Sequence, residues 1–411
     1  MGEEQMKQKL VVLVGGYYPY FGNPMGIVLD NLVDALVDKF DVTILAVKRN
    51  SAHTDSSQFF HKGAKVVTIT SKMHDLLLQQ NRFAKSWCRI LSWVKFGRFE
   101  DYLIDMMFKA MVYVYENNPF DVIMSLGFPM QLHEAAMKFR NKYKNVKWIT
   151  YSTDSCYGNS NLVSYRNAIL KKVAVSRLIR REYVYRRNAD HNFVSREIFN
   201  STAESFQHVS DKSTILDYTI LPKKQVESVV KNEVLHIVYA GGMPLKMRDP
   251  SYFLGILCAL PNALKVQLDV YLIGAKPSAL LEAERMFPQR VVVYDAVSHD
   301  EIDNIYNQRA DVLLNLGNDS DVFSPSKLFD YVSTGLPIID VYYKGRASNP
   351  VVSKHPMALR IENYGEKIDD VEALHEFLVR VRGLRLTTCQ IKRIYSEYSP
   401  EEAVRKILEV L

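Results

Sequence analysis

The residues best suited to chemistry lie in the segment 324–330, where a polar loop leads into a predicted helix. Ser324 is suited to cap that helix, because its side-chain oxygen can accept a bond from a free backbone amide. The first turn of a helix presents unpaired amides and a partial positive charge to anions. Ser326 adds a hydroxyl, Lys327 adds a full charge, and Asp330 is placed one turn later to accept hydrogen bonds from a ribose diol. The pattern predicts an anion-binding site, and a capped helix whose charges only face solvent is the alternative.

A second group of candidates opens the second half of the chain. Gly241 and Gly242 come directly after a predicted strand, where glycine lets a ligand approach the backbone closely. Lys246 and Arg248 follow before the next helix, and we expect both to face the same cleft as Lys327. A tight turn with two solvated charges is the other interpretation.

A third candidate loop follows the first predicted strand. Gly15 and Gly16 occupy the position of the crevice-facing loop in a doubly wound domain. The loop lacks the Gly-x-Gly-x-x-Gly pattern, and no acidic residue caps the second strand, so a dinucleotide-dependent dehydrogenase is disfavoured. Three tyrosines near the glycines either stack on a sugar ring or belong to the core, namely Tyr17, Tyr18 and Tyr20.

Two single side chains and one acidic motif give weaker signals. Asp154 follows a predicted strand and is the best candidate for an acceptor-side carboxylate, with an ordinary turn aspartate as the alternative. His133 is isolated on a predicted helix, where histidine is usually structural. The run 318–321 contains Asp-x-Asp, with which single-domain sugar transferases hold a metal, but here it lies far along the chain. We therefore expect neither a metal nor a cofactor.

These candidates need a scaffold of parallel strands and helices. Short β-rich apolar runs alternate with longer helical stretches, which predicts parallel α/β layers. The predicted strands are 10–14, 41–47, 65–69, 121–126, 146–151, 191–194, 235–239, 267–273, 291–294, 311–316 and 337–341. The predicted helices of the first half are 27–40, 100–117, 131–143 and 165–187. Because sheets of more than about ten strands are uncommon, we expect two Rossmann-like doubly wound domains that face each other across a cleft.

A chain of 411 residues also exceeds what one hydrophobic core usually supports. We place the first domain at 1–209, a polar linker at 210–232 and the second domain at 233–398. The remaining segment, 399–411, begins Ser-Pro-Glu-Glu and carries one apolar stripe. It is expected to form a C-terminal helix that packs back on the first domain.

The net charge of +6 suits an anionic ligand, an anionic membrane or a nucleic acid, and it does not choose among them. The four cysteines lie far apart without a Cys-x-x-Cys pair, so neither a zinc site nor a disulfide framework is predicted. No apolar run reaches the roughly 18 residues of a membrane span. A cytoplasmic location is expected.

Two basic stretches that contain aromatic residues, 82–98 and 166–187, bear on partners. Basic amphipathic helices with tryptophan commonly lie at anionic lipid surfaces. Peripheral attachment to the inner face of a membrane is therefore one interpretation, and helices with a solvated basic face are the other. No nucleic-acid recognition motif accompanies the charge, so nucleic acid is not an expected partner.

The segment 324–339 resembles the C-terminal signature of glycosyltransferase family 4, whose members have the two-domain GT-B architecture. In that signature a Pro-Ser-Lys helix start precedes an acidic residue, a small residue, Gly, Pro and a strand. The resemblance implies that Ser326 and Lys327 bind the donor diphosphate and that Asp330 binds the nucleotide ribose. Asp330 replaces the second of two family glutamates, and Val322 stands in place of the first.

The resemblance extends to the glycine loops. It implies a basic residue that contacts the diphosphate after Gly241 and Gly242, and Arg248 before an Asp-Pro pair fits this role better than Lys246. The loop at Gly15 and Gly16 would let donor and acceptor meet.

The function that the resemblance implies is a retaining, metal-independent glycosyltransferase. It would use a UDP- or GDP-linked sugar and a saccharide or lipid-linked acceptor, in cell-surface polysaccharide or glycoconjugate synthesis. The domain 1–209 would then be the acceptor side and 233–398 the nucleotide-sugar-binding side. An epimerase or phosphorylase on the same plan is an alternative. A non-catalytic nucleotide-sugar-binding module is another, favoured by Val322.

Overall fold

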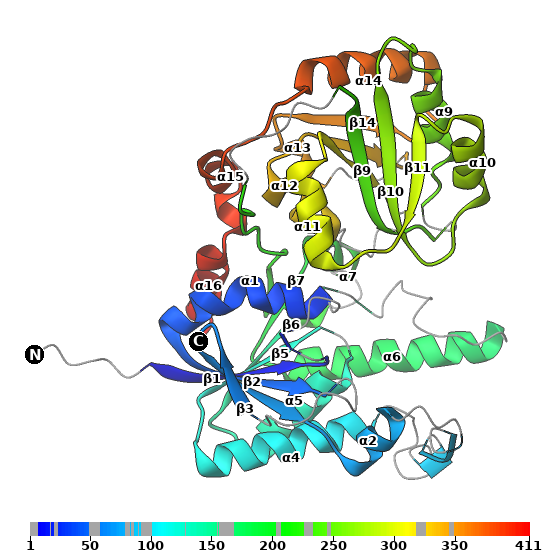
Figure 1. Cartoon of the computed structure of the whole chain (residues 1–411). Coiled ribbons are helices and arrows are strands. Elements are labelled where there is room, and N and C mark those ends of the chain that lie inside the picture. Colours follow the sequence, from blue (N-terminus) through cyan, green and yellow to red (C-terminus); the bar gives the residue numbers. More distant parts are fainter. Residues whose placement is uncertain are drawn as a thin grey trace, which may run out of the picture. The chain divides into compact units, whose positions relative to one another are not determined.

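The computed structural model describes residues 7–16, 18–19, 24–48, 58–78, 83, 86–88, 90–91, 101–127, 129–153, 155, 168–202, 207–225, 233–244, 248–317, 326–344 and 349–411. The chain divides into two compact units (Figure 1). The first unit comprises Met1–Thr219 and Pro400–Leu411, and the second comprises Ile220–Ser399. At the two ends of the second unit, the amide of Ile220 donates to the carbonyl oxygen of Tyr398 at 2.8 Å.

The first unit is built on one twisted sheet. Its described strands are β1 (Gln8–Val14), β2 (Phe40–Val47), β3 (Gln58–His61), β4 (Ala64–Ile69), β5 (Val122–Leu126), β6 (Lys147–Ser152), β7 (His191–Val194) and β8 (Ser213–Ile215). They lie in the order β3-β4-β2-β1-β5-β6-β7-β8. Neighbouring strands are parallel except for β3 with β4. Central strands such as β1 are apolar on both faces, as a parallel sheet covered on both sides requires.

Helices cover both faces of this sheet. The described helices are α1 (Pro24–Lys39), α2 (Lys72–Leu78), α4 (Tyr102–Asn117), α5 (Gln131–Lys142), α6 (Ala168–Asn188), α7 (Arg196–Thr202), α8 (Gln207–Ser210) and α16 (Pro400–Glu409). Side chains of α4 and α5 form a core with β1, β2 and β5. Helix α16 packs against α1, and it buries Ala403, Val404 and Ile407.

The second unit repeats the plan with a parallel sheet. The described strands are β9 (Leu235–Gly242), β10 (Val266–Ile273), β11 (Val291–Asp295), β12 (Val312–Leu316), β13 (Ile338–Tyr342) and β14 (Ala358–Glu362). Their order is β11-β10-β9-β12-β13-β14. The described helices are α9 (Ser251–Ala259), α10 (Ser278–Met286), α11 (His299–Gln308), α12 (Ser326–Thr334), α13 (Pro350–Ser353), α14 (Lys367–Val381) and α15 (Thr388–Ile394), followed by the 3-10 turn η2 (Ser396–Tyr398).

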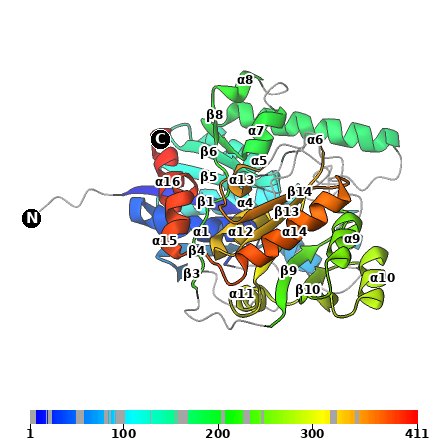
Figure 2. The ribbon, with the colours of Figure 1, turned by 90° about the horizontal axis from the view of Figure 1, so that it is seen from above.

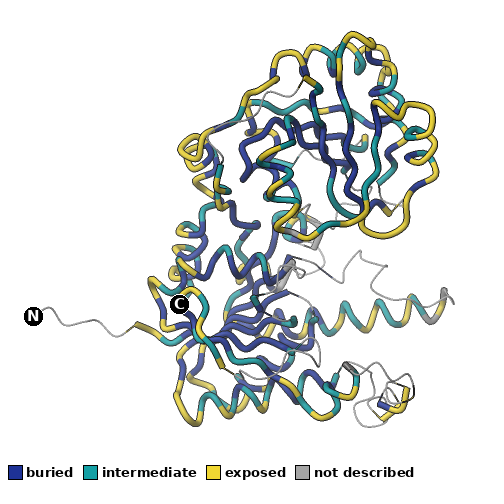
Figure 3. The backbone as a smooth tube through the Cα atoms, viewed as in Figure 1, coloured by how far each residue is buried: buried dark blue, intermediate teal, exposed yellow. Residues whose placement is uncertain are grey.

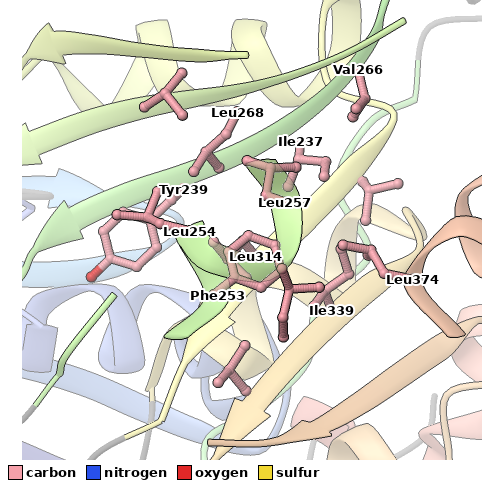
Figure 4. Packing of buried hydrophobic residues seen from close by; sticks show 14 of the residues in the cluster. Ile237, Tyr239, Phe253, Leu254, Leu257, Val266, Leu268, Leu314, Ile339 and Leu374 are labelled. Atoms are coloured by element: carbon pink, nitrogen blue, oxygen red, sulfur yellow. The ribbon is translucent and has the colours of Figure 1, made fainter. Parts of the chain in front are cut away.

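The core of the second unit lies between the sheet and the helices α9 and α14. Figure 4 shows Phe253, Leu254 and Leu257 of α9 packed against side chains of the strands, with Leu374 of α14 beside them. Figure 3 shows the same division for each unit, with buried strands inside and exposed residues on the outer faces of the helices. The site described below rests on this packed sheet.

The expected fold class of two doubly wound α/β units is confirmed. All eleven predicted strands and the four helices predicted in the first half exist, with ends within three residues of the prediction. The prediction missed three short strands, β3, β8 and β14. One of them, β8, lies inside the segment 210–232 that we expected to be a linker, and it belongs to the first sheet. Among the helices that the structure describes, none is both long and apolar enough to cross a bilayer.

Candidate functional site

The strand order gives each sheet a topological switch point. In the second unit, β9 lies between β10 and β12, so the chain builds the sheet outwards in both directions from β9 and β12. In open parallel sheets of this kind, ligands bind beyond the carboxyl ends of the strands at such a switch point. Here these ends are followed by the residues after Gly242 on one side and by Gly317 on the other. Helix α12 follows β12 in the chain, so its first turn lies beyond the same carboxyl ends of the strands.

Lys327 and Gly241 meet at this point. The Nζ atom of Lys327, on the first turn of α12, lies 4.5 Å from the centre of the Tyr239 ring and 3.5 Å from its hydroxyl oxygen. Figure 4 shows that the Tyr239 hydroxyl points away from the aliphatic cluster. Gly241 has a φ of +126°, and a Cβ atom there would lie 2.1 Å from the Lys327 Nζ. Glycine at position 241 therefore meets a need for both backbone freedom and space.

Arg248 joins the group through Gly242. Its Nη1 donates to the Gly242 carbonyl oxygen at 3.0 Å, and the Tyr239 hydroxyl donates to the same oxygen at 2.7 Å. The neighbouring Asp249 is fixed as well, because its carboxylate accepts from the Tyr364 hydroxyl at 2.5 Å. The structure thus brings together four of the predicted donor-site residues, which are Lys327, Arg248, Gly241 and Gly242.

The electrostatics of this group favour an anion. Burial, and after it the charge of Arg248, lowers the pKa of Lys327 to about 7, while Asp330 acts in the opposite direction. An ammonium that is half-buried beside a guanidinium is stabilised by a negative ligand between or beside the two cations. A diphosphate would supply that charge.

Asp330 lies one turn further along α12 and has a partner that sequence reasoning missed. Its Oδ1 lies 2.7 Å from the Nζ of Lys223, and Lys223 also forms an ion pair with Asp303 of α11. Lys223 falls in the expected linker, where two consecutive lysines gave no spacing pattern to identify it.

Ser326 is exposed at the start of α12. The predicted residues Ser324, Lys246 and Asp154 lie outside the described residues, as do Val322 and the run 318–321.

In the first unit, Gly15 and Gly16 follow β1, next to the switch point between β1 and β5. Tyr18 is fully buried, and its hydroxyl donates to Asp30 Oδ1 at 3.0 Å. His61 Nε2 lies 2.7 Å from the same oxygen. The core interpretation of Tyr18 is therefore correct and the sugar-stacking interpretation is wrong, whereas Tyr17 and Tyr20 lie outside the described residues.

His133 has the structural role that an isolated helical histidine usually has. Its Nδ1 lies 2.7 Å from the Ser125 Oγ, and its ring stacks on Tyr185 with 4.5 Å between the ring centres. Burial lowers its pKa to about 3, so the ring is neutral at physiological pH. A neutral ring that is enclosed in the core does not reach a substrate.

The two sheet topologies and the solved structures that the chain resembles define its class: the chain has the GT-B fold. Two solved structures that it resembles act in lipopolysaccharide synthesis. One is the lipopolysaccharide outer core galactosyltransferase WaaB in its apo form, with 13% identity, a TM-score of 0.59 and coverage of 98% of this chain and 100% of that chain. The other is WaaG, a glycosyltransferase involved in lipopolysaccharide biosynthesis, with 13% identity, a TM-score of 0.55 and coverage of 97% and 99%.

A third similar structure carries a sugar nucleotide analogue. It is described as trehalose-6-phosphate from E. coli bound with UDP-2-fluoro glucose, with 10% identity, a TM-score of 0.61 and coverage of 98% of both chains. Identities this low show a shared fold and nothing finer. No family model matches the sequence, and no curated protein matches it.

Proposed function

We propose that this protein is a glycosyltransferase that moves a sugar from a nucleotide-diphosphate donor to a saccharide or lipid-linked acceptor. The observation that carries the proposal is the convergence of Lys327 and Arg248 on the Gly241-Gly242 turn, at the switch point of the second sheet. The shared fold with a galactosyltransferase, and with a structure bound with UDP-2-fluoro glucose, supports the same proposal. Cell-surface polysaccharide or glycoconjugate synthesis is the corresponding biological setting.

The proposed chemistry follows from the charges. When the bond between the sugar C1 and the diphosphate oxygen breaks, the leaving nucleotide diphosphate takes the bonding electron pair and gains negative charge. Fixed donors stabilise such charge without reorganisation during the reaction. Lys327, Arg248 and the backbone amides at the start of α12 are the donors that we assign to this task, and they would act without a metal ion. We assign the acceptor side to the first unit, with Gly15, Gly16 and Asp154, and we expect a retaining outcome.

The test is a panel of UDP- and GDP-linked sugars with wild-type protein and Lys327→Ala, in the presence of an acceptor extract. We expect wild type to be stabilised by a nucleotide in a thermal shift and to release UDP or GDP, and Lys327→Ala to stay folded and lose most turnover. Lys265→Ala is a matched control. This exposed lysine directly precedes β10 and therefore lies at the amino ends of the strands, opposite the proposed site. Unchanged turnover in Lys327→Ala would contradict the assigned role.

The same panel separates the competing functions. A non-catalytic module would bind nucleotide without releasing UDP or GDP. An epimerase would convert the donor sugar while it stays linked to the nucleotide, and a phosphorylase would need inorganic phosphate. Absence of nucleotide binding in wild type would remove every function that depends on this site.

We also propose that the protein is cytoplasmic and attaches to an anionic membrane through α6. Figures 1 and 2 both show α6 extending away from the sheet of the first unit. Between Ile169 and Arg180 no described side chain is buried, and Ile169 is 74% exposed. The exposed positions of α6 combine aliphatic and basic side chains, namely Ile169, Lys172, Val173, Arg177, Arg180, Val184 and Arg187. Basic residues attract anionic lipid while aliphatic ones enter the interface.

Part of the stretch 82–98 has the same character. Phe83 is 89% exposed and Trp87 is 62% exposed.

Co-sedimentation with phosphatidylserine vesicles at low salt tests the proposed membrane attachment through α6, with phosphatidylcholine vesicles as the comparison. We expect wild type to pellet with the anionic vesicles and Arg177→Gln/Arg180→Gln to pellet less. Equal binding of both proteins would refute the role of α6.

A further inference from the structure

Lys223 is a half-buried cation at the point where the chain enters the second unit. Its side chain is only 16% exposed, and its ammonium lies between the carboxylates of Asp303 and Asp330. The backbone of the same residue is also fixed, because its amide donates to the Ser333 carbonyl oxygen at 2.9 Å. Two residues later, Gln225 Nε2 donates to the Leu386 carbonyl oxygen at 2.7 Å. The segment around Lys223 is therefore held firmly against α12.

This arrangement leaves a negative group open to a ligand. Two carboxylates share one ammonium, and the contact with Asp330 uses Oδ1 at 2.7 Å. The Asp330 side chain is 35% exposed, so the ion pair with Lys223 does not enclose it. An ionised carboxylate only accepts hydrogen bonds, and the two hydroxyls of a ribose are donors that match it.

Lys223 stays charged in this environment. Burial acts to lower its pKa, but the charges of Asp330 and Asp303 outweigh burial and raise it. The ammonium offsets the repulsion that Asp303 would otherwise exert on Asp330. It also restrains rotation of the Asp330 carboxylate, because it binds one of the two oxygens.

We propose that Lys223 is a positioning residue of the nucleotide site, which orients the Asp330 carboxylate towards the ribose and so creates a preference for ribonucleotides over 2′-deoxyribonucleotides. The inference rests on the proposed function and extends it, since it adds Asp330 as a ligand of the donor ribose. Lys223 itself touches the carboxylate and not the sugar. Its effect should therefore appear in the discrimination between nucleotides and not in the binding of a diphosphate alone.

The experiment measures by calorimetry the dissociation constants of UDP, GDP, their 2′-deoxy forms and inorganic pyrophosphate. For wild type we expect the preferred ribonucleotide to bind about tenfold more tightly than its 2′-deoxy form, the usual effect of one hydrogen bond to a charged group. In Lys223→Met this ratio should fall to about twofold or less, with pyrophosphate affinity unchanged. Lys223→Arg keeps the charge and should retain most of the ratio.

Asp303→Asn is the matched control, because it removes the other carboxylate and leaves the 2.7 Å contact between Lys223 and Asp330. It should keep the wild-type ratio. If Lys223→Met does not fold, the double variant Lys223→Met/Asp303→Asn removes the repulsion between the carboxylates and should still lose the ratio.

The possible failures are distinct. A folded Lys223→Met or double variant that discriminates as wild type does would overturn the inference and leave the proposed function intact. A wild type that does not discriminate would also overturn it. A wild type that binds neither nucleotides nor pyrophosphate would overturn the proposed function itself.

Discussion

Binding of a nucleotide-diphosphate sugar should weaken as the pH rises through neutrality, because of Lys327. In the free protein, burial and then the charge of Arg248 lower the pKa of Lys327 to about 7. A bound diphosphate places negative charge beside the ammonium and raises this pKa again. The complex therefore holds a proton that the free protein loses above pH about 7. The affinity for the sugar nucleotide should have its full value below that pH and should decline above it.

The size of the effect follows from the pKa of the free protein. If Lys327 stays protonated in the complex, the apparent dissociation constant is multiplied by 1 + 10^(pH − pKa). With a pKa of about 7, the factor is about 1 at pH 6 and about 11 at pH 8. The affinity should therefore fall about tenfold, which corresponds to about 1.4 kcal/mol.

Calorimetric titration with a UDP- or GDP-linked sugar is the appropriate assay. The intact sugar nucleotide is preferable to free UDP or GDP. The terminal phosphate of UDP or GDP titrates at about pH 6, and this titration would overlap that of Lys327. Titrations in two buffers with different ionisation enthalpies give the proton uptake, which should be about one per site at pH 8. Lys327→Met should bind more weakly and without this pH dependence. Arg248→Gln should move the decline to higher pH, because it removes one of the two causes of the low pKa.

Constant affinity of wild type between pH 6 and pH 8, without proton uptake, would refute this reasoning. It would mean either that Lys327 stays charged in the free protein or that the diphosphate binds elsewhere. A decline that persists unchanged in Lys327→Met would assign the titration to another group.

Two substitutions test other parts of the structure. Gly241→Ala should abolish nucleotide binding and lower the free energy of unfolding by about 1 kcal/mol or more, because its Cβ would displace Lys327 and its φ is +126°. Gly274→Ala is the matched control, since it has a φ of +95° but its Cβ would meet no atom within 4 Å, so it should keep nucleotide binding. Normal nucleotide binding by Gly241→Ala would contradict the geometry. Ile407→Ala should lower the free energy of unfolding by about 2–5 kcal/mol in urea denaturation, because this fully buried side chain joins α16 to the first unit. A loss below about 1 kcal/mol would show that α16 contributes little to the first unit.

The strands that were predicted from the sequence and those that were missed differ in their position in the sheet. Central strands such as β1 and β12 are buried on both faces and read as continuous apolar runs. The three missed strands, β3, β8 and β14, are all at sheet edges. An edge strand has one neighbour and partial cover, so its sequence mixes polar and apolar residues, as Gln58–His61 does. Their apolar patterns were too weak for prediction.

The candidate site likewise contains residues that the sequence predicted and residues that it did not. Lys327, Gly241 and Arg248 were predictable because each stands next to the end of an element, where the position alone implies access to a ligand. The contact between Lys223 and Asp303 was not predictable, because 80 residues separate them and no periodic pattern links them. The same applies to Tyr18, whose burial depends on Asp30 of α1 and on His61 of β3, a strand that the sequence did not reveal.

The second unit is inserted into the first, and this arrangement has a consequence for the order of folding. Helix α16 belongs to the first unit but follows the whole of the second unit in the sequence. On the ribosome, residues 220–399 emerge completely before α16 does, and domains generally fold as they emerge. The unit that starts first therefore finishes last, with the surface of α1 that α16 covers left open to chaperones or to aggregation in the interval.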